Sequence, residues 1–133
     1  MYLLDTNVVS YARKNASPAT DWLRAAAPSL LYLSVITLGE IERRIAMKER
    51  ADLKAAENLS AWLQTIRNDY ADRVLPITDR VSILWGRLSA LRARGDADGL
   101  IAATAIVHDL VLVTRNTADF EDTGVRLVNP WTD

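Results

Sequence analysis

The chain has 133 residues, half of them hydrophobic, which is enough apolar material for the core of one domain over residues 1–133. It contains no cysteine, so disulfides, thiolate nucleophiles and cysteine-bound zinc are excluded. A net charge of −1 argues against a broad nonspecific hold on nucleic acid. With no basic leader and no apolar run near the roughly 18 residues of a membrane span, we expect a soluble cytoplasmic protein.

Short apolar runs alternate with helical patterns along the chain. The strand-like runs are bounded by polar or helix-breaking residues, and they predict five strands at 2–4, 30–34, 73–75, 111–114 and 125–128. Strands separated by helices favour a parallel sheet with helices on both faces, so the predicted fold class is α/β with three α/β/α layers. Ligands of such sheets bind along the edge where the strands end.

The helical patterns carry their own start and stop signals. Ser17 followed by Pro18 predicts a helix start, and Thr37 with Glu40 predicts another that opens with a capping box. A further helix carries apolar residues from Leu59 to Ile66 at three-and-four spacing. Thr78 starts a long helix whose apolar stripe includes Leu91, and Gly95 is expected to end it. The segment 100–107 is apolar nearly all round, which predicts a buried helix.

Four carboxylates fall where this fold would bring them to one edge. Asp5 ends the first strand, Glu40 lies in the expected first turn of the helix after the second, Asp98 lies in the first turn of the buried helix, and Asp119 follows the fourth strand. Each also has an ordinary explanation. Asp5 fits a cap of the helix starting at Thr6, Glu40 fits the capping box, Asp98 fits a favourable charge near a helix start, and Asp119 fits a cap of segment 119–122.

Convergence of these acids would require a counter-charge. Carboxylates a few ångströms apart repel one another, so they must share protons or bind a cation. A set of oxygen ligands suits Mg²⁺ or Mn²⁺. Such an ion can activate water toward a phosphodiester and stabilise the leaving oxygen. The lone His108 leaves little room for catalysis by a histidine pair, and its place at the end of the buried helix favours a structural role.

A second charged feature is a group of basic residues within twelve positions. These are Arg43, Arg44, Lys48, Arg50 and Lys54. They alternate with acids, which favours a solvated helix face, while a local phosphate-binding strip remains the alternative.

Four segments in order resemble the motifs of the PIN-domain family, specifically the VapC-type toxins of bacterial toxin–antitoxin pairs. The segment LLDTNVVS at 3–10 resembles the family's opening motif, and LSVITLGE at 33–40 resembles its second. DGLIAATA at 98–105 and VTRNTADF at 113–120 resemble the third and fourth. The closing Asn129-Pro130-Trp131 is similar to the FitB-like branch. The resemblance covers the whole chain, and Gly99 falls in a variable position of the third motif.

The resemblance implies a site, a cofactor and partners. It matches Asp5, Glu40, Asp98 and Asp119 to an acidic metal site for Mg²⁺ or Mn²⁺. It matches Thr114 and Asn116, and less closely Thr6 and Asn7, to polar positions that orient these acids or contact phosphate. Members of the family are typically endoribonucleases, with transfer RNA among the expected targets. They usually form homodimers and higher assemblies with a cognate antitoxin, which binds operator DNA and inhibits the toxin.

The resemblance and the acids together predict hydrolysis of RNA by a metal-activated water, with 5′-phosphate and 3′-hydroxyl products. Two other functions are kept open. One is a PIN domain that acts on DNA, or whose acids serve docking and structure. The other is a phosphoacceptor module like a response regulator, which needs an aspartate right after the third strand, where this chain has Pro76.

Overall fold

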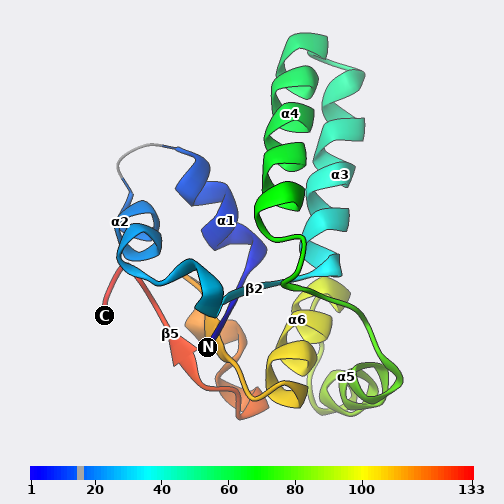
Figure 1. Ribbon diagram of the computed structural model, residues 1–133. Coiled ribbons are helices and arrows are strands. Elements are labelled where there is room, and N and C mark those ends of the chain that lie inside the picture. The colour runs from blue at the N-terminus through cyan, green and yellow to red at the C-terminus, as the bar shows by residue number, and fades with distance from the viewer. Residues whose placement is uncertain (15–16) are drawn as a thin grey trace.

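A computed structural model describes residues 1–14 and 17–133 (Figure 1). Within these residues the sheet is parallel throughout, with strand order β3-β2-β1-β4-β5. The strands are short: β1 (Tyr2–Leu4), β2 (Leu31–Ser34), β3 (Val74–Leu75), β4 (Val111–Val113) and β5 (Leu127–Val128). All five lie within the predicted runs, and most are a residue or two shorter.

Helices connect the strands, as the alternating pattern predicts. They are α1 (Thr6–Arg13), α2 (Pro18–Ala25), α3 (Val35–Glu49), α4 (Leu53–Asp69), α5 (Asp79–Leu91) and α6 (Asp96–Val107). The described residues also contain three short 3₁₀ turns: η1 (Pro28–Leu30), η2 (Thr117–Asp119) and η3 (Glu121–Thr123). The antiparallel pair α3–α4 extends away from the sheet, while α1 and α2 lie apart from α5 and α6 (Figure 1). No helix of the described chain is both long and apolar enough to cross a membrane.

Alternating side chains of the strands build a core on each face of the sheet. Leu3 and Leu112 are fully buried in the cluster with α5 and α6. Their neighbours Leu4 and Val113 are fully buried in the cluster with α1, α2 and part of α4. This alternation follows from the two-residue period of a strand. The predicted three-layer α/β/α class is therefore confirmed, and the all-round apolar helix α6 is buried as expected.

The predicted cap of α3 is wrong by three residues, since the cap is Ser34 and not Thr37. The helix begins at Val35, and the side chain of Ser34 caps it by accepting a hydrogen bond from the amide of Ile36 at 3.0 Å. Thr37 is therefore inside the helix, and Glu40 lies in its second turn. Because the cap is already provided by Ser34, the capping box expected from Thr37 and Glu40 does not form, and both side chains are available for other contacts.

Gly95 does not end α5, contrary to the prediction. The helix stops at Leu91, and Gly95 instead occupies the cap position before α6. Leu91 lies outside the core, with 71% of its surface exposed, because the helix ends there and the chain turns away. The predicted helix starts at Ser17 and Thr78 are confirmed, since each side chain caps its helix. The tail packs onto the domain, with the ring of Trp131 edge-on to that of Tyr11 and the two ring centroids 5.1 Å apart.

Helix α6 packs tightly against α5 at Gly99. A methyl group added there would lie 2.9 Å from Cδ1 of Trp85, closer than two carbons pack. We therefore expect Gly99→Ala to lower the free energy of unfolding by about 1–2 kcal/mol, since the overpacking outweighs the better helix propensity of alanine. Gly86→Ala in α5 is the matched control: its added methyl meets nothing within 4 Å. It should raise stability by up to about 1 kcal/mol. Urea unfolding of both variants measures the difference.

Candidate active site

The site lies where the strand order reverses. β1 is central, the chain builds β2 and β3 on one side, and it then returns to build β4 and β5 on the other. Such a switch point leaves a crevice at the carboxyl ends of the strands. Asp5 directly follows β1 and Thr114 directly follows β4, so the topology alone brings them together.

Asp5 is held rigidly at this crevice. Its amide donates a hydrogen bond to the carbonyl of Val113 at 2.9 Å, and its carboxylate accepts one from the hydroxyl of Thr114 at 2.8 Å. Asp5 is 3% exposed and Thr114 is fully buried. Although Asp5 occupies the cap position of α1, its side chain makes no cap hydrogen bond. The helix-cap explanation of Asp5 is therefore wrong.

Glu40 reaches the same crevice through a chain of hydroxyl groups. The hydroxyl of Thr6 donates to Oε1 of Glu40 at 2.6 Å, and Oγ1 of Thr37 lies 2.9 Å from Oγ1 of Thr6. Since Thr6 has one hydroxyl hydrogen, Thr37 must donate to Thr6. The three side chains join α1 to α3 and fix the position of the Glu40 carboxylate. Thr37 was missed as a site residue because its sequence position also fits a helix cap.

Asp98 enters the site from the first turn of α6, as predicted. It is half-buried, and its pKa is raised first by burial and then by the negative charges of Asp119 and Glu40, with Arg94 acting in the opposite direction. Burial also raises the pKa of Asp5, to about 6, and the charges of Asp98 and Glu40 add to this effect against the hydrogen bond from Thr114. The four carboxylates therefore act on one another through a shared region.

Asp119 is exposed and is positioned through its backbone. It is the last residue of η2, so it does not cap a segment over 119–122. Its carbonyl accepts hydrogen bonds from Arg92 at 2.9 Å and Arg94 at 3.2 Å. Arg94 also donates to both carboxylate oxygens of Asp122, at 3.2 and 2.7 Å, which lowers the pKa of Asp122.

The two arginines thus tie the start of α6 to the turn that carries Asp119. They come from the connection between α5 and α6, where the sequence shows only basic residues near a glycine. Their function as anchors was missed because it depends on the position of a turn about 25 residues further along the chain.

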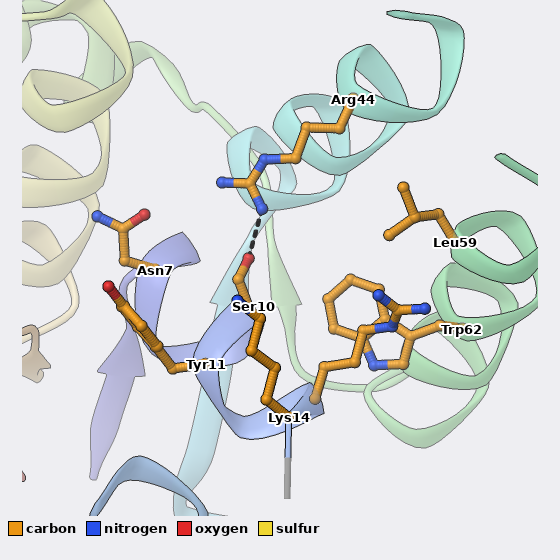
Figure 2. Close-up of a pocket in the computed structure, with 8 residues that line it drawn as sticks. Asn7, Ser10, Tyr11, Lys14, Arg44, Leu59 and Trp62 are labelled. Atoms are coloured by element: carbon orange, nitrogen blue, oxygen red, sulfur yellow. Dashed lines mark hydrogen bonds between the residues drawn. The ribbon is translucent and has the colours of Figure 1, made fainter. Parts of the chain in front are cut away.

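The remaining predicted polar residues divide into two groups. Thr6 and Thr114 contact site carboxylates directly. Asn116 is exposed, and its backbone N–H donates a hydrogen bond to Oγ1 of Thr114. This bond supports the hydroxyl that donates to Asp5. Asn7 is among the residues that line a neighbouring pocket, and within the described chain it forms no hydrogen bond to a site carboxylate (Figure 2).

The donors fit a hard divalent ion by their chemistry, since all are carboxylate oxygens. Within residues 1–14 and 17–133, however, no three acidic, histidine or cysteine side chains stand close enough to hold an ion already.

A parallel sheet with carboxylates at its switch point defines a class of small α/β domains with an acidic site. The family model described as PIN domain matches residues 2–125. The chain is 37% identical to the plasmid stability protein StbB of Pseudomonas syringae pv. tomato, over 98% of this chain and 99% of that one. It is 34% identical to the VapC ribonuclease Y4jK of Sinorhizobium fredii, over 98% of both.

The chain is also 34% identical to the toxin FitB of Neisseria gonorrhoeae over the full length of both. Among solved structures, that of FitAB bound to an IR36 DNA fragment matches all of this chain and 97% of the other, with a TM-score of 0.87 and 30% identity. The chain therefore belongs to the PIN-domain family, in the group of the VapC and FitB toxins.

The raised pKa of Asp5 predicts a pH-dependent stability without added metal. The folded protein holds the Asp5 proton more tightly than the unfolded chain, whose pKa is 3.8. The contribution of the Asp5 proton to the free energy of unfolding is therefore lost as pH rises from about 4 to about 6, and it is absent at higher pH. Asp5→Asn removes this pH dependence while keeping an oxygen that accepts the hydrogen bond from Thr114. In EDTA, the free energy of unfolding of Asp5→Asn relative to wild type should rise by up to about 3 kcal/mol between pH 4 and pH 7.

Denaturant unfolding across this pH range measures that difference. Glu121→Gln, which removes an exposed carboxylate outside the site, serves as the control and should follow wild type. A constant difference between Asp5→Asn and wild type at all pH values would contradict the buried, crowded state of Asp5.

Proposed function

We propose that the protein is a metal-dependent endoribonuclease and the toxin of a type II toxin–antitoxin pair. The observation that carries the proposal is the mutual electrostatic effect of Asp5, Glu40, Asp98 and Asp119 at the sheet's switch point. Crowded, partly buried carboxylates destabilise a protein unless a counter-charge is bound between them. A divalent cation is the counter-charge that fits a set of oxygen ligands. The relatives named VapC ribonuclease and toxin FitB support the activity.

Mg²⁺ or Mn²⁺ would be held by Asp5 and Asp98, with Glu40 and Asp119 adjusting the charge or holding a second ion. When bound, such an ion supplies Lewis acidity that activates water and stabilises a leaving oxygen. The chain's own residues provide the orientation. Thr114 fixes Asp5, and Thr6 with Thr37 fixes Glu40.

The reaction is the hydrolysis of a phosphodiester. Water adds to phosphorus and the bond from phosphorus to the 3′ oxygen breaks. A site carboxylate such as Glu40 would take a proton from the attacking water, and a proton would be returned to the 3′ oxygen, which leaves as a hydroxyl. The products then carry 5′-phosphate and 3′-hydroxyl ends. Recovery of 2′,3′-cyclic phosphate ends would rule this route out, since they form only when the 2′ hydroxyl is the nucleophile.

The partners follow from the same relatives. The structure of FitAB bound to an IR36 DNA fragment supports a partner protein for this chain and a complex that binds DNA. As the family resemblance implies, we take the partner to be a cognate antitoxin, the assembly to be a homodimer or larger complex, and the contact with operator DNA to be made through the antitoxin. Transfer RNA is included among the substrates to be tested. DNA cleavage is the alternative activity, because the same donor set serves either backbone.

Carboxylate substitutions test the assignment. Asp98→Asn should reduce cleavage of a cellular RNA pool in Mn²⁺ by at least about a hundredfold, since loss of a metal ligand removes charge that stabilises the transition state. Asp96→Asn is the matched control, because Asp96 lies two residues earlier in the same helix turn and is exposed. It should keep activity within about twofold of wild type. Equal activity of both variants would mean that the assigned site is wrong.

Substrate and cofactor are separated in the same assay. Labelled RNA and labelled single-stranded DNA are each incubated with protein plus Mn²⁺, with and without EDTA. We expect cleavage of RNA alone and its loss in EDTA. Cleavage of DNA at a comparable rate would favour the alternative, and cleavage that survives EDTA would exclude metal dependence.

Metal binding is expected to stabilise the fold independently of catalysis. Neutralising the carboxylates removes their repulsion, so Mn²⁺ at a hundred times its Kd should add about 2.7 kcal/mol to the free energy of unfolding. Asp5→Asn should lose most of this gain, because a principal ligand is gone. Thermal melts with increasing Mn²⁺ measure both, and an identical Mn²⁺ response of the variant and wild type would show that Asp5 is not a ligand.

A further inference from the structure

A pocket of about 270 Å³ lies between α1 and the α3–α4 pair (Figure 2). Its walls combine cationic, aromatic and hydroxyl side chains, from Ser10, Tyr11, Arg13, Lys14, Arg44 and Trp62. None of the four site carboxylates lines this pocket, and it lies outside the buried core. The volume is just below the roughly 300 Å³ at which small-molecule sites begin, so it suits one small planar group with its phosphate rather than a long segment.

The pocket is strongly cationic. Arg13, Lys14 and Arg44 all line it, and no acidic side chain is among the described residues that do. In the same part of the chain, none of the three forms an ion pair with a carboxylate. Three positive charges that face one cavity without counter-charges favour an anionic ligand.

Two residues of the pocket lie one helical turn from residues of the carboxylate site. Arg44 is one helical turn beyond Glu40 on α3, and Ser10 is one turn beyond Thr6 on α1, so each pair lies along one helix face. Thr6 bonds Glu40, and Arg44 bonds the hydroxyl of Ser10 at 2.6 Å, which repeats the α1–α3 link one turn away (Figure 2). A chain bound across the carboxylates would therefore meet Arg44 next.

The far wall offers a surface for a flat ring. The guanidinium of Arg13 lies over the ring of Trp62, 5.5 Å from its centroid, and Leu59 adds apolar surface beside it. Unpaired bases of RNA stack on aromatic rings and on arginine planes. Phosphate and base therefore have separate partners in one pocket: Arg44 and Lys14 for the phosphate, and the Arg13–Trp62 pair for the base.

We propose that this pocket binds one unpaired nucleotide of the RNA substrate, adjacent to the phosphodiester that is cut. The proposal rests on the proposed function and adds a positioning site outside the carboxylates. Arg44 and Lys14 bind the phosphate, and the base stacks against Arg13 and Trp62. An acidic protein segment also needs cations, but the stacking surface and the direct path to the hydrolytic site favour RNA.

Binding of RNA in the absence of metal tests the pocket apart from catalysis. The probe is a fluorescently labelled pool of single-stranded RNA with randomised sequence, titrated with protein in EDTA at several salt concentrations. We expect Arg44→Ala to weaken binding about tenfold and to reduce the slope of log affinity against log salt by about 0.7, the value for one lost phosphate contact on single strands. Cleavage in Mn²⁺ should show a raised KM with little change in kcat.

Arg43→Ala is the matched control. Arg43 precedes Arg44 on α3 and is exposed, so Arg43→Ala removes the same charge. Arg43 does not line the pocket. It should bind RNA within about twofold of wild type, because surface substitutions away from a site have small effects. If Arg44→Ala and Arg43→Ala bind the pool equally, the pocket is not a phosphate site and the proposal is overturned.

The stacking surface needs a separate variant, because Trp62 also packs against the core and its truncation could unfold the helix. Arg13→Ala and Trp62→Leu are therefore compared, with thermal melts to show that each is folded. Both should weaken RNA binding several-fold, as expected for lost stacking. Trp62→Leu should leave the salt slope unchanged, whereas Arg13→Ala also removes a positive charge and should reduce that slope. A folded Trp62→Leu with wild-type RNA affinity contradicts base stacking.

Two further outcomes separate this proposal from the proposed function. If wild-type protein cuts no RNA in Mn²⁺, the proposed function fails. If it cuts RNA but the pocket variants match Arg43→Ala, only the nucleotide site fails. Loss of binding to a labelled oligoglutamate peptide in Arg44→Ala, with RNA affinity unchanged, would assign the pocket to an acidic protein partner instead.

Discussion

The structure depends on placing four negative charges at one edge of a parallel sheet and keeping them there. Asp5 is almost fully buried, and burial together with Asp98 and Glu40 raises its pKa to about 6. The hydrogen bond from Thr114 opposes this and stabilises the ionised form. The charges of Asp98 and Glu40 act on Asp5, and those of Asp119 and Glu40 act on Asp98, so the site is electrostatically connected across the sheet edge.

Rigid elements support each carboxylate by a different route. Backbone pairing with β4 holds Asp5, the Thr37–Thr6 hydroxyl chain holds Glu40, and the start of α6 carries Asp98. Two arginines hold the turn that carries Asp119 by its carbonyl. The contacts join segments from both ends of the chain, so the site forms only when the sheet is complete. Stability and function are therefore coupled in this fold.

Charge is distributed unevenly although the whole chain is almost neutral. The carboxylates gather at the switch point, while Arg13, Lys14 and Arg44 gather in the pocket between α1 and the α3–α4 pair. A polyanion cannot approach acids alone, since like charges repel. Adjacent cations without counter-charges offset that repulsion beside the site. The net charge of −1 therefore conceals two opposite surfaces that lie next to each other.

The sequence by itself determined the fold class and the five strands, because hydrophobic period is a local property. It also predicted the four acids as the site, from their positions near strand ends and helix starts. It did not determine that Ser34 rather than Thr37 caps α3, or that Gly95 precedes α6 rather than ending α5. Each choice depends on which cap competes best once the helices pack. Only the tertiary structure decided which distant side chains form hydrogen bonds. Thr37 bonds Thr6, Arg94 bonds the carbonyl of Asp119, and Arg44, one of the basic residues of α3, bonds Ser10. These partners are about 25 to 34 residues apart, and no local pattern encodes a contact at that distance.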